Sequence, residues 1–328
     1  MTTTHETPSP PRTAADLLDD PRHRDLVQDM HWFLGSPLAG IFGGLLLDQV
    51  ANPAIAAAVD HTGRFAANFT DRGVRSFAFG ALMAFGDAAD SQAFREELKS
   101  LHTEVKGSGK GAFEGTRYSA LRPDLWIWVA VSSINSVYRS YLYLCGRRLD
   151  DEQKEVVYQV LRDSMSYLEL PSKQGKLPAT LPQFLEYYDR VAESDLADNE
   201  FLHFARANFI APPPPTLMPR RRRRVLRPIW GPLMTVAARP TIVCSDRVCH
   251  PRMRELLGIN RDSGLDRAEF ALYVTLMRLA WRRLPRWLTL EPLAYNRYRY
   301  ERLRESYRRV LLDSFAVPPE RTDPASRQ

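Results

Sequence analysis

The sequence has few of the short Val- and Ile-rich runs that strands require. An α/β protein should show runs of about four to eight such residues alternating with helices, and almost none occur among the 328 residues. Apolar residues instead recur at helical spacing, as at Phe94, Leu98, Leu101 and Val105. We therefore predict an all-α protein. The length allows two average domains or one large one, and we expect a single large helical domain.

Cysteine is also scarce. Cys145, Cys244 and Cys249 form an odd set spread over a long chain, which argues against a disulfide framework and for a reducing compartment. Segment 1–13 lacks the apolar stretch of a secretory signal. The longest apolar run, Leu38–Leu47, contains three glycines, ends at Asp48 and has about half the length of a membrane span. We expect a soluble cytoplasmic protein.

The common catalytic motifs are missing as well. The chain has no phosphate-binding loop, GxSxG elbow, dinucleotide-binding glycine pattern or metalloprotease helix, so hydrolase and kinase functions lose their usual support. Cys244, Cys249 and His250 lie close together, but four residues separate the cysteines and no second pair of ligands follows. We favour ordinary thiols over a zinc site here.

Lysine is absent after Lys176, and the charge is unevenly distributed. Residues 1–200 carry 20 basic against 28 acidic residues, whereas residues 201–328 carry 25 against 11. A basic last third raises nucleic acid and anionic membranes as partners, although an arginine excess also fits a GC-rich coding sequence. Because the chain lacks a nucleic-acid-binding module and interleaved aromatics, we expect no nucleic-acid partner. A weak peripheral attraction to acidic membranes stays open.

Low-complexity segments suggest where the helical domain begins and ends. Residues 1–21 are rich in Pro, Ser and Thr and are expected to form a disordered tail, as are residues 316–328 at the other end. The helical domain is expected over residues 22–315. Within it, residues 211–224 contain a run of prolines followed by five arginines, which cannot bury a face and should form an extended surface connector.

Several helices follow from periodicity and end signals. Gly73–Phe85 is apolar on nearly all sides, which predicts a helix buried against several others. The next helix should be capped within Asp87–Ser91 and end in a flexible loop with glycines at 107, 109 and 111. A long helix should begin at Pro123 and close at Gly146. Further helices are expected over residues 54–59, 151–168, 180–191, 195–208, 247–257, 265–283 and 295–312.

His102 lies on the apolar side of its predicted helix, four residues after Leu98 and three before Val105. One interpretation is a hydrogen-bonded core histidine. Another is an axial ligand of a b-type haem held among apolar helices, since the chain lacks the CxxCH motif of covalent haem attachment. Arg72 and Arg75 either cap or pair within the preceding helix, or place cations near a haem propionate or bound oxygen.

The order of short motifs resembles the family that contains the bacterial latex-clearing protein, a rubber oxygenase, and the fungal oxygenase MpaB, which cleaves a prenyl side chain in mycophenolic acid biosynthesis. The resemblance covers residues 30 to 210 or so. Its matching segments are Asn52–His61, Arg72–Ser76, Phe85–Asp87, Leu101–Gly107, Arg117–Val129 and Leu177–Phe184.

This resemblance implies an all-α fold that encloses haem b, with the histidine of the HxxVxG motif as the axial ligand of the iron. That histidine is His102. The latex-clearing proteins place an arginine and a lysine on the distal side in an RxxKT pattern. Here the pattern is Arg72, Arg75 and Ser76, so arginine replaces the lysine and serine the threonine. Arginine is a poor iron ligand because it stays protonated.

Two further departures from the family pattern concern histidines. The family usually has His-Pro where this chain has Asn52-Pro53, and usually a histidine where this chain has Ala130. If those histidines set hydrogen bonds around the haem in relatives, this chain has a changed pocket. We count Asn52, Ala130 and Phe79 among the expected haem contacts, and Asp60 as a candidate proton acceptor beside Arg72 and Arg75.

The expected function is a haem-dependent oxygenase or oxidase that acts on a hydrophobic or prenyl-like small molecule with dioxygen or peroxide. Oxidative cleavage of a carbon–carbon double bond is the family precedent, and hydroxylation, desaturation and oxidative ring closure stay open. The alternative is a non-catalytic helical binding protein that senses haem or docks on a membrane through its basic last third.

Overall fold

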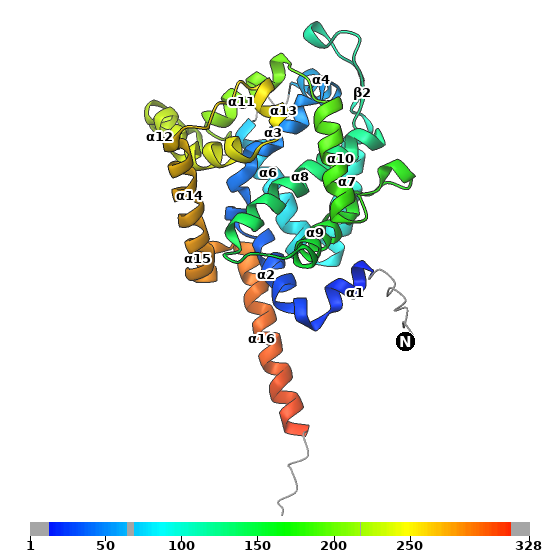
Figure 1. Ribbon diagram of the computed structural model, residues 1–328, viewed down its shortest axis with the longest axis vertical. Helices are drawn as coiled ribbons and strands as arrows, with labels where there is room; N and C mark the ends of the chain where they lie inside the picture. The colour runs from blue at the N-terminus through cyan, green and yellow to red at the C-terminus, as the bar shows by residue number, and fades with distance from the viewer. Residues whose placement is uncertain (1–12, 64–68, 217, 316–328) are drawn as a thin grey trace, which may run out of the picture.

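The computed structural model describes residues 13–63, 69–216 and 218–315, and these residues form one helical domain with a single small β hairpin (Figure 1). The all-α prediction is confirmed. The label η marks a 3-10 helix. The elements are α1 (Ala14–Asp19), η1 (Pro21–His23), α2 (Arg24–Leu34), η2 (Pro37–Leu46), α3 (Leu47–Ala51), α4 (Pro53–Thr62), α6 (Phe69–Phe85), α7 (Ala88–Thr103), β1 (Lys106–Ser108), η3 (Gly111–Phe113), β2 (Arg117–Ser119), α8 (Pro123–Leu144), α9 (Asp151–Met165), η4 (Ser166–Leu168), η5 (Lys173–Gly175), α10 (Leu181–Ser194), α11 (Glu200–Ile210), α12 (Arg220–Val248), α13 (Pro251–Leu256), α14 (Gly264–Arg283), α15 (Arg286–Thr289) and α16 (Pro292–Phe315).

Helix α8 is the centre of the core and is buried along most of its length. Its predicted end signals are confirmed: Pro123 is the first residue of the helix, and Gly146 follows its end with a positive φ. Small side chains let η2 approach closely. The hydroxyls of Ser136 and Ser140 donate to the carbonyls of Phe42 (3.0 Å) and Ala39 (2.8 Å), which satisfies the polar groups that this contact buries.

The half-buried carboxylate of Asp29 joins α2 to α8, α14 and α15. Asp29 on α2 accepts hydrogen bonds from the Tyr141 hydroxyl of α8 (2.9 Å), the Trp281 indole of α14 (3.4 Å) and the Arg286 guanidinium of α15 (3.2 Å). The same guanidinium lies over the Trp281 ring at 3.8 Å from its centroid. Asp29 therefore holds together four helices that lie far apart in the sequence.

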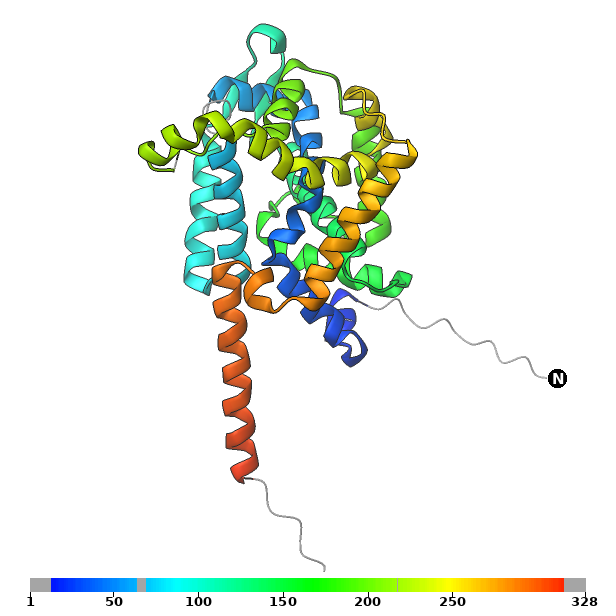
Figure 2. The same cartoon turned by 90° about the vertical axis from the view of Figure 1, so that its left-hand side faces the viewer.

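Helices α6 and α7 form an adjacent pair along one side of the molecule, in cyan in Figure 2. The C-terminal end of α6 is anchored because Phe85 packs against His31 and Trp32 of α2. Its N-terminal end is anchored by Thr70, which donates to the carbonyl of Pro213. Between these ends most of α6 is exposed, including Phe77, so the expectation of burial on all sides of Gly73–Phe85 is wrong.

The expected glycine-rich flexible loop after α7 is an antiparallel hairpin, β1 and β2, in which Gly107 pairs with Tyr118. Gly107 leaves room for the Tyr118 side chain, because a Cβ at this position would lie 2.9 Å from the Tyr118 hydroxyl. The glycine of the HxxVxG motif therefore has a packing role.

Two segments that were expected to lack helix are helical. Residues 14–19 of the predicted N-terminal tail form α1, which begins with a capping box between Thr13 and Asp16. Arg220–Arg224 do not continue an extended connector but open α12, a helix that contains Pro228, Pro232 and Pro240. Residues 1–12 and 316–328, expected as tails, lie outside the described residues.

Among the described residues, no single helix is long and apolar enough to cross a membrane, although the bent pair Pro21–Leu34 and Pro37–Ala51 meets the length and composition requirement together. That pair supplies core residues such as Met30, Phe33 and Phe42, all fully buried. In both views α16 projects away from the body of the molecule (Figures 1 and 2).

Candidate functional site

His102 lies in the last turn of α7, with its ring partly buried. Its Nδ1 lies 2.7 Å from the backbone carbonyl oxygen of Leu98, one turn earlier. A carbonyl oxygen can only accept, so Nδ1 donates, and in the neutral imidazole the lone pair is then on Nε2. This is the tautomer that a metal-binding imidazole adopts when its second nitrogen is oriented by a backbone carbonyl.

The α6–α7 pair places the two predicted arginines level with this histidine. Phe79 of α6 packs edge-on against Phe94 of α7, with ring centroids 6.3 Å apart. Both helices rise about 1.5 Å per residue. In an antiparallel pair with this register, Arg72 and Arg75 therefore lie level with the end of α7 that carries His102.

Arg72 and Arg75 have different surroundings. Arg72 has an exposed surface, yet desolvation lowers the pKa of its guanidinium below the ordinary value. Protein atoms near the Arg72 guanidinium therefore exclude part of the solvent around it. Arg75 and Ser76 are exposed one turn further along α6, and Phe79 is half-buried toward α7.

Helix α8 faces His102 with an apolar stripe. The Trp126 ring meets the imidazole edge-on at 5.2 Å between centroids, and its indole N–H donates to the Leu168 carbonyl oxygen at 2.5 Å. One turn later Val129 is 37% exposed in a helix that is otherwise largely buried, whereas Ala130 is fully buried. Phe77 of α6 and Leu101 of α7 are 45% and 58% exposed.

Two polar residues near this stripe were not predicted. The Gln49 amide of α3 donates to the Val129 carbonyl (3.3 Å) and to the Ser132 hydroxyl (2.8 Å), which fixes α3 beside the exposed face of α8. Tyr167 of η4 packs against Phe79 at 6.0 Å, and burial raises the pKa of its hydroxyl to about 12. No sequence motif marks either residue, because both acquire their role through tertiary contacts.

Two other predicted site residues serve the ends of α4. Asn52 accepts hydrogen bonds through its side-chain oxygen from the backbone N–H groups of Ala54 (3.0 Å) and Ile55 (3.4 Å), so it is the N-cap. Asp60 lies exposed near the other end of α4, and the neighbouring His61 ring lies 6.0 Å from that of Tyr118. No described contact joins Asn52 or Asp60 to His102.

The residues present around His102 fit a b-type haem. The imidazole can offer Nε2 as a ligand atom, α6, α7 and α8 each carry an exposed large apolar side chain, and a partly desolvated arginine lies level with the histidine. Arg72 is the residue suited to a propionate, since a partly desolvated guanidinium binds carboxylates through charge-assisted hydrogen bonds.

A second buried polar site lies around Asp48 of α3, which faces Tyr188 of α10. This carboxyl is 1% exposed; Oδ2 accepts from the Tyr188 hydroxyl at 3.0 Å, and Oδ1 has no partner in the described part of the chain. Desolvation raises the pKa of Asp48 to about 8, so the carboxyl is largely protonated at neutral pH. The sequence gives one signal for it: Asp48 is the acid that ends the apolar run Leu38–Leu47.

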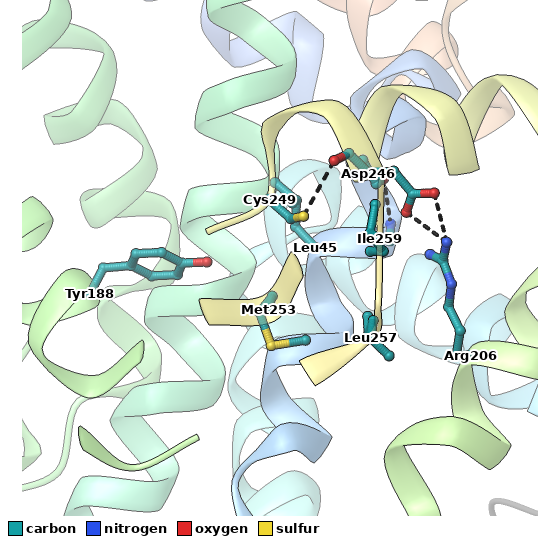
Figure 3. A pocket seen from close by; sticks show the side chains of 10 residues that line it. Leu45, Tyr188, Arg206, Asp246, Cys249, Met253, Leu257 and Ile259 are labelled. Carbon is teal, nitrogen blue, oxygen red and sulfur yellow. Dashed lines mark hydrogen bonds and ion pairs between the residues drawn. The ribbon is translucent and has the colours of Figure 1, made fainter. Parts of the chain in front are cut away.

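Figure 3 shows the Tyr188 hydroxyl pointing from α10 toward a small cavity between α10, α11, α12 and α13. Its volume is about 10 Å³, enough for about one water molecule. Asp246 on its wall forms an ion pair with Arg206 at 2.7 Å. The cavity is too small for an organic substrate, so its polar groups serve the packing of these helices.

In the described part of the chain, the cysteines belong to no group of three or more possible metal ligands. Burial raises the pKa of both Cys244 and Cys249 to about 12, so both stay thiols. The one cluster of three possible ligands found among the described residues is elsewhere and consists of Asp20, His23 and Glu152. The Arg22 guanidinium already contacts both of its carboxylates, at 2.6 and 3.2 Å.

Comparison with known proteins gives one match. The family model described as "ER-bound oxygenase mpaB/B'/Rubber oxygenase, catalytic domain" matches residues 29–279, which run from α2 into α14 and include His102 and both arginines of α6. No curated protein and no solved structure matches the chain.

Proposed function

The chain belongs to the mpaB/rubber oxygenase family, and from this premise we propose that it is a haem-dependent oxygenase or oxidase that acts on a hydrophobic or prenyl-like small molecule. Membership supports an oxygenase catalytic domain in general terms. The haem and the substrate class are the parts of the proposal that rest on the residues of this chain.

The observation that carries the haem assignment is the hydrogen bond from His102 Nδ1 to Leu98. It orients the imidazole, fixes its tautomer and leaves Nε2 as the ligand atom. A bound haem would supply the iron at which dioxygen or peroxide is activated. Trp126 would limit rotation of the ring, because its indole is fixed in turn by the Leu168 carbonyl.

The arginines of α6 would supply positive charge near the reacting groups. Arg72, which is partly desolvated, would hold a propionate, and Arg75 would donate hydrogen bonds to an oxygen ligand or to a developing negative charge. Neither can act as a general base, because a guanidinium stays protonated. Asp60 remains a proposed proton acceptor that lies at the exposed end of α4.

The proposed substrate class rests on exposed apolar side chains of the helices that carry His102 and its neighbours. Phe77, Leu101 and Val129 are exposed large apolar side chains on α6, α7 and α8. Such surfaces are suited to bind isoprenoid or other hydrocarbon chains by burial of apolar area. We expect the reactive position of such a chain to be a carbon–carbon double bond.

The experiment is turnover of the haem-reconstituted protein with ¹⁸O₂ and a farnesyl-bearing probe, followed by mass spectrometry. We expect labelled oxygen in the product from the wild type, and a loss of at least about tenfold in rate for Arg75→Ala if Arg75 stabilises negative charge. Haem-loaded protein that consumes neither dioxygen nor peroxide with any isoprenoid would contradict the oxygenase assignment and favour haem sensing.

A second candidate function is attachment to an acidic membrane surface. The first half of α12 carries an exposed apolar stripe directly after its five arginines, consisting of Val225, Ile229, Leu233 and Val236. Arginines beside an exposed apolar stripe are typical of helices that lie in a membrane interface. We propose a cytoplasmic location with this face toward anionic lipid; an unchanged distribution of protein on adding vesicles that contain phosphatidylglycerol would exclude it.

A further inference from the structure

A second pocket lies on the side of the molecule that carries α12 to α14, away from the residues of the proposed haem site. Its volume is about 590 Å³, within the range of small-molecule sites. Three helices and one loop contribute charged groups to it, and α8 and α14 contribute aromatic rings. The lining residues are Tyr143, Arg247, Arg254, Asp262, Arg267 and Phe270.

Three arginines converge on Asp262. Arg247 donates to Asp262 Oδ1 at 2.8 Å, Arg254 donates to Oδ2 at 2.8 Å, and Arg267 donates to the backbone carbonyl of Asp262 at 2.8 Å. The two guanidinium groups on the carboxylate come from different helices, α12 and α13. The site is therefore already arranged to grip a planar or tetrahedral oxyanion from two sides.

The pocket has a surplus of positive charge. Asp262 is the single carboxylate among the lining residues and neutralises one of the three guanidinium groups. The side chains of Arg247 and Arg254 are only 29% and 27% exposed, so solvent screens their charge less than that of a free surface arginine. Two nearby acids are already engaged: Glu255 pairs with Arg252 and Asp266 with Arg261.

One wall of the pocket is aromatic. The rings of Tyr143 and Phe270 meet edge-on with centroids 5.5 Å apart, and both are half-buried. The Tyr143 backbone is fixed by Arg278, which donates to its carbonyl at 3.1 Å. An aromatic wall beside guanidinium groups suits a ligand that combines an anionic head with a flat or apolar body.

We propose that this pocket binds an organic phosphate, with Arg247 and Arg254 on the phosphate oxygens and Tyr143 and Phe270 against the organic part. Asp262 occupies the same donors in the free protein and competes with the ligand. The proposal is independent of the oxygenase function, since it uses none of the residues around His102.

The test measures binding of phenyl phosphate, methyl phosphate and inorganic pyrophosphate to the full chain by calorimetry at low salt. We expect saturable binding of phenyl phosphate, tighter than that of methyl phosphate. Arg254→Ala should weaken it by about tenfold or more, because charge-assisted hydrogen bonds are lost. Asp262→Asn should tighten it by about threefold or more, because the competing charge is removed.

Arg309→Ala is the matched control, since it removes the same charge from α16, where Arg309 pairs with Glu305 on the surface. An equal loss of affinity in this control would reduce the effect to net charge and overturn the proposal. The proposal would also be overturned if Arg254→Ala and Asp262→Asn both lowered the melting temperature and neither changed phenyl phosphate binding. That result would mean that the ion pairs only stabilise the fold.

Vesicles containing phosphatidic acid distinguish the source of the phosphate. Binding to phenyl phosphate in solution, lost in Arg254→Ala, assigns a soluble ligand. Binding to the vesicles alone, lost in Arg254→Ala and retained in Arg309→Ala, assigns the phosphate of a lipid headgroup to the same arginines. Absence of both overturns the site.

Discussion

Replacing Asp48 by asparagine should change how the stability of the protein depends on pH. The carboxyl is 1% exposed, and desolvation raises its pKa from the usual 3.8 of an aspartate to about 8. The native state therefore holds a proton that the unfolded chain releases near pH 4. Asparagine keeps the shape of the side chain and an oxygen for the Tyr188 hydroxyl, but cannot ionise.

The sign of the effect follows from proton binding. Between pH 4 and 8 the native carboxyl binds more protons than the unfolded one, so stability is highest below about pH 4 and is lost as pH rises toward 8. Each unit of pH in this window costs about 1.4 kcal/mol. From pH 5 to 7, Asp48 alone should therefore lower the free energy of unfolding by about 3 kcal/mol.

The assay is urea unfolding of the wild type and Asp48→Asn at pH 5, 6, 7 and 8, followed by circular dichroism. The difference between the two proteins isolates Asp48, because all other titrating groups are shared. We expect the free energy of unfolding of the variant to increase steadily relative to that of the wild type as pH rises. Asp60→Asn, a change at an exposed acid, should show no such trend. A difference between wild type and Asp48→Asn that is constant across this range would refute a buried, protonated Asp48.

Three further predictions concern packing and cofactor binding. Asp29→Ala should lower the free energy of unfolding by about 3 kcal/mol in urea, because it leaves the Tyr141 hydroxyl and the Arg286 charge without their shared acceptor. Gly107→Ala should lower the free energy of unfolding by about 1 to 3 kcal/mol, measured in the same way, because the new methyl group would meet the Tyr118 hydroxyl. Adding Tyr118→Phe removes that hydroxyl and should recover part of the loss. If the double variant were as destabilised as Gly107→Ala alone, this contact would not be the cause. Arg72→Ala should weaken haem binding by about tenfold in an equilibrium titration, and an unchanged affinity would remove Arg72 from the propionate role.

The local signals of the sequence correctly predict the ends of several helices. Asn52 before Pro53 predicts a helix start and is the N-cap of α4, and Asp87 caps α7 by accepting from the Asp90 N–H at 2.8 Å. These features succeed because capping depends on residues within three or four positions of one another. The all-α class follows for the same reason, since helical periodicity is local.

The failures have non-local causes. Residues 211–224 were expected to form an extended connector because a run of prolines and five arginines cannot bury a face, yet Arg220–Arg224 open α12. The buried residues of this helix, Ile242–Asp246, lie far along the chain from the arginines, and α12 packs against η2, α11 and α14. The exposure of α6 was also missed, because apolar composition on all sides says only that a helix can be buried, whereas its neighbours decide whether it is.

At the proposed haem site, the sequence predicts His102 and the arginines of α6 as site residues but does not predict the contacts that they make. The spacing of His102 places it on the inner side of α7, yet the bond from its Nδ1 to Leu98 and the edge contact with Trp126 appear only in the fold. Asn52 was expected to contact the haem because relatives usually have a histidine at this position, and in the fold its side chain caps α4. No sequence motif marks Tyr167, because its contact with Phe79 joins two segments that are far apart in the sequence.

The central claim is that His102 holds the iron of a b-type haem through Nε2. The most direct measurement is an equilibrium haem titration of the wild type, His102→Ala and His203→Ala, followed by the Soret absorbance. His203 is a suitable control because it is exposed and pairs with Asp198. The account predicts a shifted Soret band that saturates at one haem per chain in the wild type and the control, and a changed spectrum restored by added imidazole in His102→Ala. Identical spectra and affinities in all three proteins would contradict it.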